Sequence, residues 1–558
     1  MPDRTAIEVR ATAPEAPEMV ASADPSRVFA GHRRLYLSLG AMAFLLFWGL
    51  PSLILPLSTD EAIYAVGART VLRGGELYRD FWDIKPPLTY LTYVVPLGIG
   101  GADSVLALRL FNLLAIGAGM AVVFALTARF FSDRAALLAA CLYCFGYFGV
   151  AWFGHQGEAE SYMAAPLLLA FAAYRVRGAG VYRMALVAGL LLGIAIAYKP
   201  TAALLALGLP AMELLFRQQD WTPRAAVERL ALAAVGVLAV QAAWVAYLLA
   251  VGTWADFVDI QRNYTLPYND YRWLAGTPLW RSILDPTGGW LVNSAYLIVP
   301  AWIAVMLGLF RGKRQPTLLL GGLALLAVLS VWWQGKYFDY HWLIVLPFLA
   351  PLAGYAFDQA IDLTRSLARG DAYLARGLLA AGFIVLAIWP VLRTYDAYGL
   401  LLDRTLGNIS QQTVENHYLA EYEANVQLVD QIREQGDPDD SFYVFGFWAL
   451  PYFLEERPLP ARFITNASVR STWSPESWRQ ELIDDLERVR PRFVAVAAGD
   501  HQPWLTGTYQ ASDQFMCDSF PELRRFIEEN YHAIMNNGLF VLYDAEATLH
   551  SAAPRCVA

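Results

Sequence analysis

Long apolar runs recur along most of this 558-residue chain. Each run is close to the roughly 20 residues that an α-helix needs to cross a hydrocarbon core of about 30 Å. Hydrophobic residues make up 57% of the sequence and charged residues only 16%, which is too apolar for a soluble protein of this size. The sequence therefore predicts a polytopic α-helical membrane protein. We expect eleven spans, at residues 35–57, 104–128, 135–153, 160–176, 183–198, 200–216, 229–251, 289–310, 317–333, 341–358 and 376–394.

The basic residues between these runs predict how the chain is oriented. With eleven spans, every basic connection falls on one side, which the positive-inside rule makes the cytoplasmic side. Residues 86–101 are apolar but short and interrupted by Pro and Gly, and a twelfth span there would invert the pattern downstream. We therefore expect residues 86–101 to lie in or against the outer interface as a juxtamembrane or re-entrant helix. The basic connections contain Arg33 and Arg34; Arg129 and Arg134; Arg175, Arg177 and Arg183; Arg217, Arg224 and Arg229; Arg311, Lys313 and Arg314; and Arg365, Arg369 and Arg376.

The two ends of the chain differ in composition from its centre. Residues 1–30 are rich in Ala, Pro and acids and have no apolar stretch, so we expect a disordered cytoplasmic tail before a transmembrane domain at 31–396. Residues 397–558 have the composition of a soluble domain, and an odd number of spans places this domain outside the cell or in the periplasm. Strand-like segments alternate there with helical ones, which predicts a small α/β domain. The expected strands are 441–447, 492–498 and 538–544, and the expected helices are 413–435, 475–489 and 519–530.

The net charge and the cysteines limit the possible partners and cross-links. A net charge of −8 offers no basic surface for nucleic acid. Cys141 and Cys144 lie within a predicted span and are interpreted as small buried hydrophobes. Cys517 and Cys556 lie in the outer domain, where they form a disulfide or stay free thiols; their separation alone does not decide between the two.

Two adjacent carboxylates follow the first span, in the predicted outer loop 58–103. Ser58 and Glu61 have the spacing of a helix N-terminal capping box, so Glu61 is either a cap or a catalytic acid. Asp60 would lie in the first helical turn, where the helix dipole favours the ionised form that a general base requires. Arg109, about one turn inside the second span, is expected to form a structural salt bridge with this loop, because an unpaired arginine in a span is costly.

Three lysines occur on the outer side, where the positive-inside rule disfavours them. Lys85 precedes two prolines, and Lys199 and Lys336 follow the fifth and ninth predicted spans. Lysines that converge on the side that holds Asp60 indicate an anionic ligand, such as a phosphate. Arg262, in the long outer loop 252–288, is a weaker candidate for the same role.

The segment His155–Glu160 holds a second group of candidate residues. Glu158 and Glu160 with the nearby His155 would bind a divalent metal together with Asp60, would hydrogen-bond sugar hydroxyls, or would form a solvated turn, and the sequence leaves all three open. Tyr340 and His341, at the start of the tenth span, are expected to line the same cavity. The alternative for His341 is a satisfied interfacial histidine.

The first outer loop contains Thr59-Asp60-Glu61, followed by Gly75, Tyr78, Asp80, Trp82, Asp83 and Lys85-Pro86-Pro87. Its pattern is similar to that of the polyprenyl-phosphate-sugar-dependent glycosyltransferases of the GT-C superfamily, in the branch with protein O-mannosyltransferases, the aminoarabinose transferase of lipid A and Rgt-type transferases. Ala107–Leu110, Glu160 and Lys199 also fit. Some relatives have an acid directly before the lysine; here that position is Ile84, so its role would pass to Asp83.

This resemblance implies an inverting transfer of a sugar, in the plasma membrane, from a polyprenyl-phosphate-linked donor to a hydroxyl of lipopolysaccharide, glycan or protein. Asp60, with Glu61, would be catalytic, and Lys85, Lys199, Lys336 and Arg262 would bind the donor phosphate. The mechanism requires no cofactor, and a divalent metal is left open. The alternative is a transporter or flippase of lipid-linked sugars. Transporters place ionisable residues near the midplane of the membrane and contain internal repeats. In this chain the charged residues cluster at one interface, and the sequence shows no repeat. The sugar and the acceptor would contact Asp83, His155, Glu158, Glu160, Tyr340 and His341.

Overall fold

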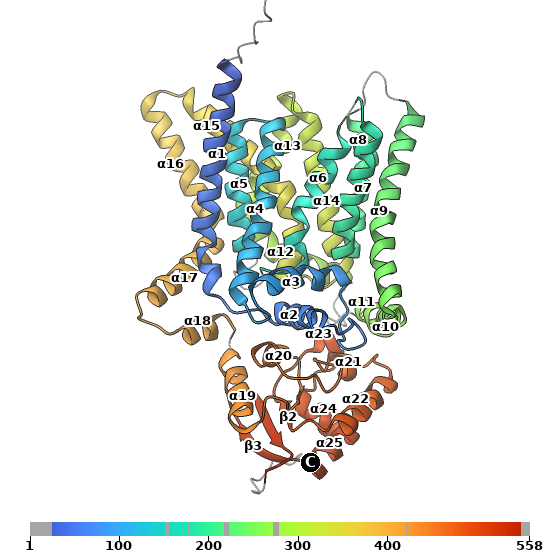
Figure 1. The fold of residues 1–558 in the computed structure, drawn as a ribbon. Coiled ribbons are helices and arrows are strands. Elements are labelled where there is room, and N and C mark those ends of the chain that lie inside the picture. Colours follow the sequence, from blue (N-terminus) through green and yellow to red (C-terminus); the bar gives the residue numbers. More distant parts are fainter. Residues whose placement is uncertain are drawn as a thin grey trace, which may run out of the picture.

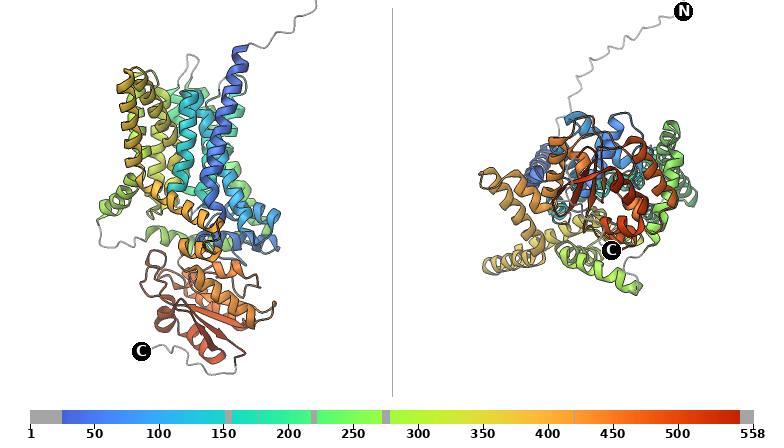
Figure 2. Two further views of the ribbon diagram at one scale, coloured as in Figure 1. Left: turned by 90° about the vertical axis from the view of Figure 1, so that its left-hand side faces the viewer. Right: turned by 90° about the horizontal axis from the view of Figure 1, so that it is seen from below.

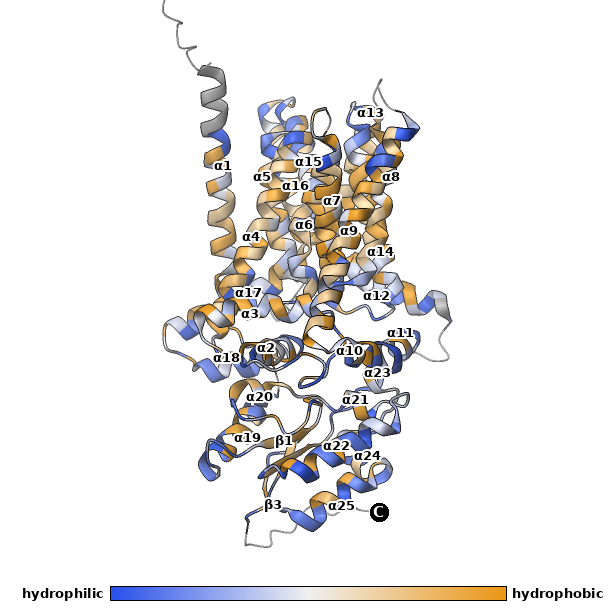
Figure 3. Cartoon of the chain, turned by 45° about the vertical axis from the view of Figure 1, so that its right-hand side comes forward, coloured by the Kyte–Doolittle hydropathy of each residue, from blue (hydrophilic) through white to orange (hydrophobic). Residues whose placement is uncertain are grey.

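The computed structural model describes residues 25–150, 156–176, 178–216, 222–271, 278–419 and 421–547. A bundle of long helices forms one half of the molecule, and a smaller domain with a β-sheet lies against one end of it (Figure 1). The same two layers are visible after a quarter turn (Figure 2). Apolar residues fill the middle of the bundle and polar residues gather at its two ends (Figure 3), which is the distribution that a bilayer selects.

The bundle is made by helices that the sequence predicted as spans. In the described part of the chain, six helices are long and apolar enough to cross a membrane, or up to eight if each of two bent pairs is one span. The other expected spans, 135–153, 160–176 and 200–216, correspond to α5, α6 and η3 with α8, which stand in the same bundle. The bundle helices are α1 (Pro25–Gly49), α4 (Val105–Phe130), α5 (Asp133–Val150), α6 (Ala164–Tyr174), α7 (Val181–Tyr198), η3 (Pro200–Leu207), α8 (Gly208–Leu215), α9 (Pro223–Val251), α13 (Ala295–Phe310), α14 (Arg314–Gln334), α15 (Leu346–Arg365) and α16 (Arg369–Leu386).

Two expected spans are bent where the sequence analysis assumed straight helices. The expected span 289–310 begins in α12 and turns by 89° into α13, and 376–394 turns by 75° between α16 and α17. The second bend follows from the short break at Ala387, after which α17 runs on as a strongly amphipathic helix. A helix with one apolar and one polar face is stable along an interface rather than through it.

Short helices lie between the bundle and the C-terminal domain. Helix α3 covers the segment 86–101 that we expected at the interface, and Figure 1 shows it lying across the end of the bundle. The elements of this layer are η1 (Leu50–Ile54), α2 (Thr59–Leu72), α3 (Pro87–Gly100), η2 (Ala159–Tyr162), α10 (Trp254–Ile260), the π-helix η4 (Gln261–Thr265), α11 (Leu266–Asp270), α12 (Leu279–Asn293), η5 (Asp339–Val345), α17 (Ile388–Thr405) and α18 (Gln411–Tyr418).

The C-terminal domain is built on a four-stranded sheet of order β1-β2-β4-β3. Strands β1 and β2 are parallel, so their carboxyl ends meet at one edge of the sheet. The predicted helix 413–435 is divided into α18 and α19, and the sequence analysis missed β3, which pairs antiparallel with β4. The elements are α19 (Tyr422–Gln435), β1 (Phe442–Phe445), α20 (Leu450–Leu454), α21 (Ala467–Arg470), α22 (Glu476–Val489), β2 (Phe493–Ala497), α23 (Pro503–Thr506), α24 (Ser512–Ser519), α25 (Pro521–Asn530), β3 (His532–Asn536) and β4 (Phe540–Asp544).

Hydrogen bonds fasten this domain to the layer of short helices. The guanidinium of Arg69, on α2, donates to the carbonyl oxygens of Tyr452 (3.1 Å) and Phe453 (3.0 Å) on α20. The backbone N–H of Trp82 donates to the carbonyl of Arg462 at 2.9 Å. Because backbone groups on both sides take part, the edge of the sheet that carries the ends of β1 and β2 is held over α2.

Of the two cysteines that the sequence analysis interpreted as buried hydrophobes, only Cys144 is buried. Cys141 is partly exposed, and both are free thiols. Cys517 is disulfide-bonded, so of the two states that the sequence left open for it the structure has the bonded one. Cys556, His155 and residues 1–24 of the predicted tail lie outside the described residues, while residues 25–30 of that tail belong to α1.

Candidate active site

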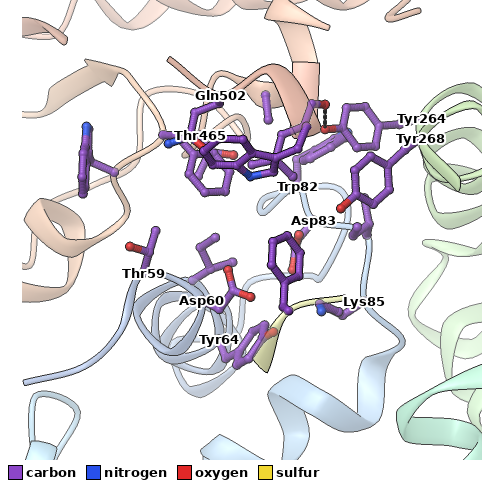
Figure 4. Close-up of a pocket in the computed structure, with 18 of the residues that line it drawn as sticks. Thr59, Asp60, Tyr64, Trp82, Asp83, Lys85, Tyr264, Tyr268, Thr465 and Gln502 are labelled. Atoms are coloured by element: carbon purple, nitrogen blue, oxygen red, sulfur yellow. Dashed lines mark hydrogen bonds between the residues drawn. The ribbon is translucent and has the colours of Figure 1, made fainter. Parts of the chain in front are cut away.

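A cavity of about 290 Å³ lies between the short helices and the C-terminal domain. Its floor comes from the start of α2 and the segment 82–85, its side from α11 and η5, and its roof from loops of the C-terminal domain (Figure 4). The lining residues are Thr59, Asp60, Ile63, Tyr64, Trp82, Asp83, Ile84, Lys85, Tyr264, Tyr268, Phe338, Tyr340, Phe447, Trp448, Thr465, Ala467, Gln502, Trp504 and Leu505.

Helix α2 begins with the capping box that its sequence predicts. The backbone N–H of Glu61 donates to the Ser58 hydroxyl (3.2 Å), and the backbone N–H of Ser58 donates to the Glu61 carboxylate (2.8 Å). The cap fixes the first turn of α2 at the floor of the cavity. Asp60 therefore lines the cavity while its neighbour Glu61 faces the protein interior.

Glu61 is a buried junction between three segments. Its carboxylate accepts from the Arg109 guanidinium at 2.6 Å and from the backbone N–H of Gly157 at 2.8 Å, and Glu61 and Arg109 are both fully buried. The salt bridge expected for Arg109 is confirmed. Glu61 does not line the cavity, and its capping hydrogen bonds with Ser58 are present, while the catalytic role that the sequence analysis also considered stays a prediction.

Of the two carboxylate oxygens of Asp60, only one accepts a hydrogen bond from the described residues. The Tyr340 hydroxyl donates to Oδ2 of Asp60 at 3.0 Å. Within the described part of the chain, Oδ1 has no hydrogen-bond partner. The Tyr340 ring also lies 5.8 Å from the Lys199 ammonium. Tyr340 thus orients Asp60 and leaves Oδ1 available to a ligand.

Lys85 is the cationic side chain among the described residues that line the floor of the cavity. The Tyr78 hydroxyl donates to the Lys85 carbonyl at 2.8 Å, and Arg462 of the C-terminal domain donates to the Tyr78 carbonyl at 2.9 Å. Burial works to lower the pKa of the Lys85 ammonium, but the carboxylates around it, Asp60 foremost, outweigh burial and raise this pKa above its usual value. Lys85 is therefore a firmly protonated cation beside Asp60.

Asp83 lies next to Lys85 in the same cavity. It accepts a hydrogen bond of 2.6 Å from the Tyr90 hydroxyl. Burial raises the pKa of the Asp83 carboxyl, although the Tyr90 hydrogen bond and Lys85 oppose the shift. The two carboxyl groups of the cavity thus differ in environment, which lets them take different roles.

The other predicted phosphate ligands do not line the cavity. Lys199 forms an ion pair with Glu160. The Lys336 ammonium donates to the carbonyl oxygens of Tyr268 (2.7 Å) and Tyr271 (3.0 Å), where it ties the end of α14 to α11. Arg262 is exposed on η4. Of the four cations, the structure brings only Lys85 to the lining of the cavity.

The predicted group around Glu158 forms part of the wall behind the floor. Glu158 is fully buried and accepts from the Tyr64 hydroxyl at 3.0 Å, and Glu160 is held by Lys199. Over the described residues, no group of three or more His, Cys, Asp and Glu side chains has the geometry to hold a metal ion. His341 is buried with its ring edge against Tyr340, at 4.7 Å between centroids, and does not line the cavity.

The sequence analysis missed the roof. Phe447 and Trp448 follow the carboxyl end of β1, and Gln502, Trp504 and Leu505 follow that of β2. Both strands were predicted, and ligands of α/β domains bind outside the carboxyl ends of parallel strands. The sequence predicts the strands but not which of them pair, so it did not reveal that the carboxyl ends of β1 and β2 lie side by side.

Comparison with known proteins shows which of them this architecture resembles. A family model described as dolichyl-phosphate-mannose-protein mannosyltransferase matches residues 84–247. The crystal structure of ArnT from Cupriavidus metallidurans bound to undecaprenyl phosphate matches with a TM-score of 0.58 over 95% of this chain and 100% of that chain, at 17% sequence identity. The chain has the fold of ArnT. The resemblance predicted from residues 59–87 and the predicted fold class are thereby confirmed.

Other matches extend the comparison. The apo state of the same ArnT gives a TM-score of 0.58 at 16% identity, over 95% of this chain and 100% of that chain. The archaeal oligosaccharyltransferase AglB from Archaeoglobus fulgidus, in complex with an inhibitory peptide and a dolichol-phosphate, gives 0.47 at 14% identity, over 93% of this chain and 74% of that chain. No curated protein matches the chain. The apolar helices and the ArnT fold together make the chain a multipass membrane protein, with its cavity at one end of the bundle.

Proposed function

We propose that this GT-C chain is an inverting glycosyltransferase that moves a sugar from a polyprenyl-phosphate-linked donor to an acceptor hydroxyl at the outer face of the membrane. One observation carries the proposal: Asp60, with a free carboxylate oxygen, and Lys85, a protonated cation, line one cavity at the membrane end of the C-terminal domain. A base and a phosphate-binding cation are the two groups that such a displacement requires.

The reaction uses both groups in one step. Asp60 Oδ1 accepts the proton of the acceptor hydroxyl as the acceptor oxygen forms a bond to the anomeric carbon. The bond from that carbon to the phosphate oxygen breaks, and the electron pair leaves with the polyprenyl phosphate. Attack from the face opposite the phosphate inverts the anomeric configuration. The Lys85 ammonium balances the charge that grows on the leaving phosphate, so no general acid is needed.

The surrounding residues position Asp60 and Lys85. Glu61 and Arg109 set the first turn of α2, and Tyr340 turns Asp60 toward the cavity. We assign Lys199 and Lys336 to positioning as well, because their partners are Glu160 and the end of α11. Asp83 lines the cavity beside Lys85 and is placed to accept from a sugar hydroxyl.

Similarity to ArnT supports the donor class, since ArnT is described bound to undecaprenyl phosphate. The orientation of the chain rests on charge. Helices α5 and α9 begin at the end of the bundle away from the cavity (Figure 1), with Arg134 and Arg229 in their first turns or close to them. Arg34 pairs with Asp133 at the start of α5. By the positive-inside rule, this charge distribution supports a position of the cavity and the C-terminal domain in the periplasm or the extracellular space. The acceptor we propose there is a hydroxyl of lipopolysaccharide, glycan or protein.

The decisive test replaces the base. Asp60→Asn should lower transfer by about a hundredfold or more, the usual contribution of a general base, while donor binding is retained. The assay would incubate purified protein with a panel of polyprenyl-phosphate sugars and follow donor consumption and product by mass spectrometry. Asp103→Asn makes the same chemical change on the same side, outside the cavity, and should leave the rate unchanged. A normal rate in Asp60→Asn would reject the mechanism.

The phosphate role is tested separately at Lys85. Lys85→Met should weaken donor binding by about ten- to a hundredfold, because charge-assisted hydrogen bonds to a phosphate contribute about 1.5–3 kcal/mol. Lys336→Met, which removes a lysine outside the cavity lining, should weaken it less. Equal losses in the two variants would restore the three-lysine phosphate site that the sequence predicted.

A further inference from the structure

The roof of the cavity differs in chemistry from its floor. Asp60, Asp83 and Lys85 on the floor are charged, whereas none of the described residues that line the roof is. The roof offers aromatic rings, one hydroxyl and one amide (Figure 4). Its members are Phe447, Trp448, Thr465, Ala467, Gln502, Trp504 and Leu505.

Several uncharged polar groups around the cavity have no hydrogen-bond partner among the residues that the structure describes. The indole N–H groups of Trp82 and Trp448 are buried and lack a hydrogen-bond acceptor among the described residues, although only 3% and 8% of these residues is exposed. Over the same residues, the Thr465 hydroxyl and the Gln502 amide also make no hydrogen bond. Buried donors are nearly always satisfied, so donors that line a cavity without a partner indicate a ligand or ordered water.

The roof is held rigidly enough to recognise a ligand. Arg470 and Asp500 form a fully buried ion pair at 3.1 Å, and the Ser512 hydroxyl donates to Asp500 at 2.6 Å. The Tyr264 hydroxyl of η4 donates to the Leu505 carbonyl at 2.9 Å, which ties the roof to the wall of the cavity. Fixed donors lose little conformational entropy when a ligand binds.

We infer that the roof binds the acceptor, and that the attacking hydroxyl belongs to an uncharged sugar residue. The inference rests on the proposed function, because an in-line displacement places the acceptor opposite the phosphate. Lys85 lies on the membrane side of the cavity, and Gln502 and Thr465 lie across from it (Figure 4). Aromatic faces and neutral hydrogen-bonding groups suit a polyhydroxylated ring. A phosphate or carboxylate at the roof would lose its hydration without a cation to replace it.

Binding of small sugars to the full-length protein in nanodiscs tests this inference. The probes are uncharged methyl pyranosides, each paired with its 6-phosphate, and the readout is the dissociation constant from saturation-transfer NMR. The wild type should bind at least one uncharged pyranoside and bind its phosphate at least tenfold more weakly. Trp448→Phe and Gln502→Leu should weaken binding of the uncharged probe about three- to tenfold, the effect of one lost hydrogen bond.

A matched control is available in the same domain. Trp473 also has a buried indole N–H without a partner among the described residues, but it does not line the cavity, so Trp473→Phe should leave sugar binding unchanged. Equal or tighter binding of the phosphates, no binding of any uncharged pyranoside, or an equal loss in Trp473→Phe would overturn the inference. Failure of the transferase proposal is distinguishable, because donor consumption would then be absent while these binding differences remain.

Discussion

At the scale of single residues, the site depends on charges that are buried and fully paired. Glu61 and Arg109 are both inaccessible to solvent and meet at 2.6 Å. Removing one partner leaves the other charge buried without compensation, which typically costs about 3–5 kcal/mol. We expect Glu61→Gln and Arg109→Met each to lower the thermal midpoint strongly, and the double variant to lose much less than the sum of both. Strictly additive losses would show that the two side chains do not interact.

Lys336 gives the protein a predictable pH dependence. Burial lowers the pKa of its ammonium to about 8 from the usual value of 10.5. Below pH 8 the native and unfolded states are both protonated, and the native state carries the full cost of a buried charge. As the pH rises toward 10.5, the native lysine is neutral while the unfolded one still holds its proton, so the free energy of unfolding increases.

The variant Lys336→Met lacks this titration. The thermal midpoint of the wild type, measured relative to Lys336→Met, should therefore rise between about pH 7.5 and pH 9.5. Differential scanning fluorimetry of both proteins over this range would check it. A difference that stays constant or falls with pH would contradict the pKa shift.

At the scale of elements, the position of α9 depends on glycines. A Cβ at Gly189 on α7 would lie 2.0 Å from the carbonyl oxygen of Ala233, and one at Gly236 on α9 would lie 2.5 Å from that of Leu186. Small residues let the two backbones touch, which is how helices associate in a bilayer. Helix α9 leads directly into α10, η4 and α11, so this contact also places Tyr264 and Tyr268 beside the cavity.

The contact predicts the effect of single methyl groups. Gly189→Ala and Gly236→Ala should each destabilise the protein by about 1–3 kcal/mol, as overpacking does, and should weaken donor binding. Gly322→Ala on α14 meets nothing within 4 Å and should be neutral or slightly stabilising. Thermal midpoints and donor titrations of the three variants would compare them. An unchanged midpoint in the α7 and α9 variants would mean that these helices separate in the membrane.

At the scale of the whole molecule, the proposed function requires the cavity and the C-terminal domain to be outside. Asp270 on α11 and Gln480 on α22 are exposed on the cavity side, and Gly312 lies at the other end of the bundle. In a background without native cysteines, single cysteines at 270 and 480 should react with an impermeant thiol reagent in intact cells, whereas one at 312 should react only in inverted vesicles. The reverse pattern would place the cavity in the cytoplasm.

The sequence by itself determined the features that depend on local chemistry. Apolar runs of about 20 residues predict helical spans because a backbone in lipid must satisfy its hydrogen bonds internally, as a helix does within one segment. The Ser58–Glu61 spacing predicts the cap of α2 because the capping hydrogen bonds are local. Asp60, Asp83, Lys85 and Tyr340 were all candidates before the structure was known, and all four line the cavity.

Only the tertiary structure decided which candidates face the cavity. Glu61 and Asp60 are neighbours in sequence, yet one is buried against Arg109 and the other faces the cavity, because successive helix positions point about 100° apart. Lys199 and Lys336 lie on the expected side but have partners that no local pattern reveals. The roof depends on the parallel pairing of β1 with β2 and on the docking of the domain over α2. The first joins residues about 50 positions apart and the second joins residues such as Arg69 and Tyr452, which are 383 positions apart. Their physical cause lies in packing rather than in any segment of the chain.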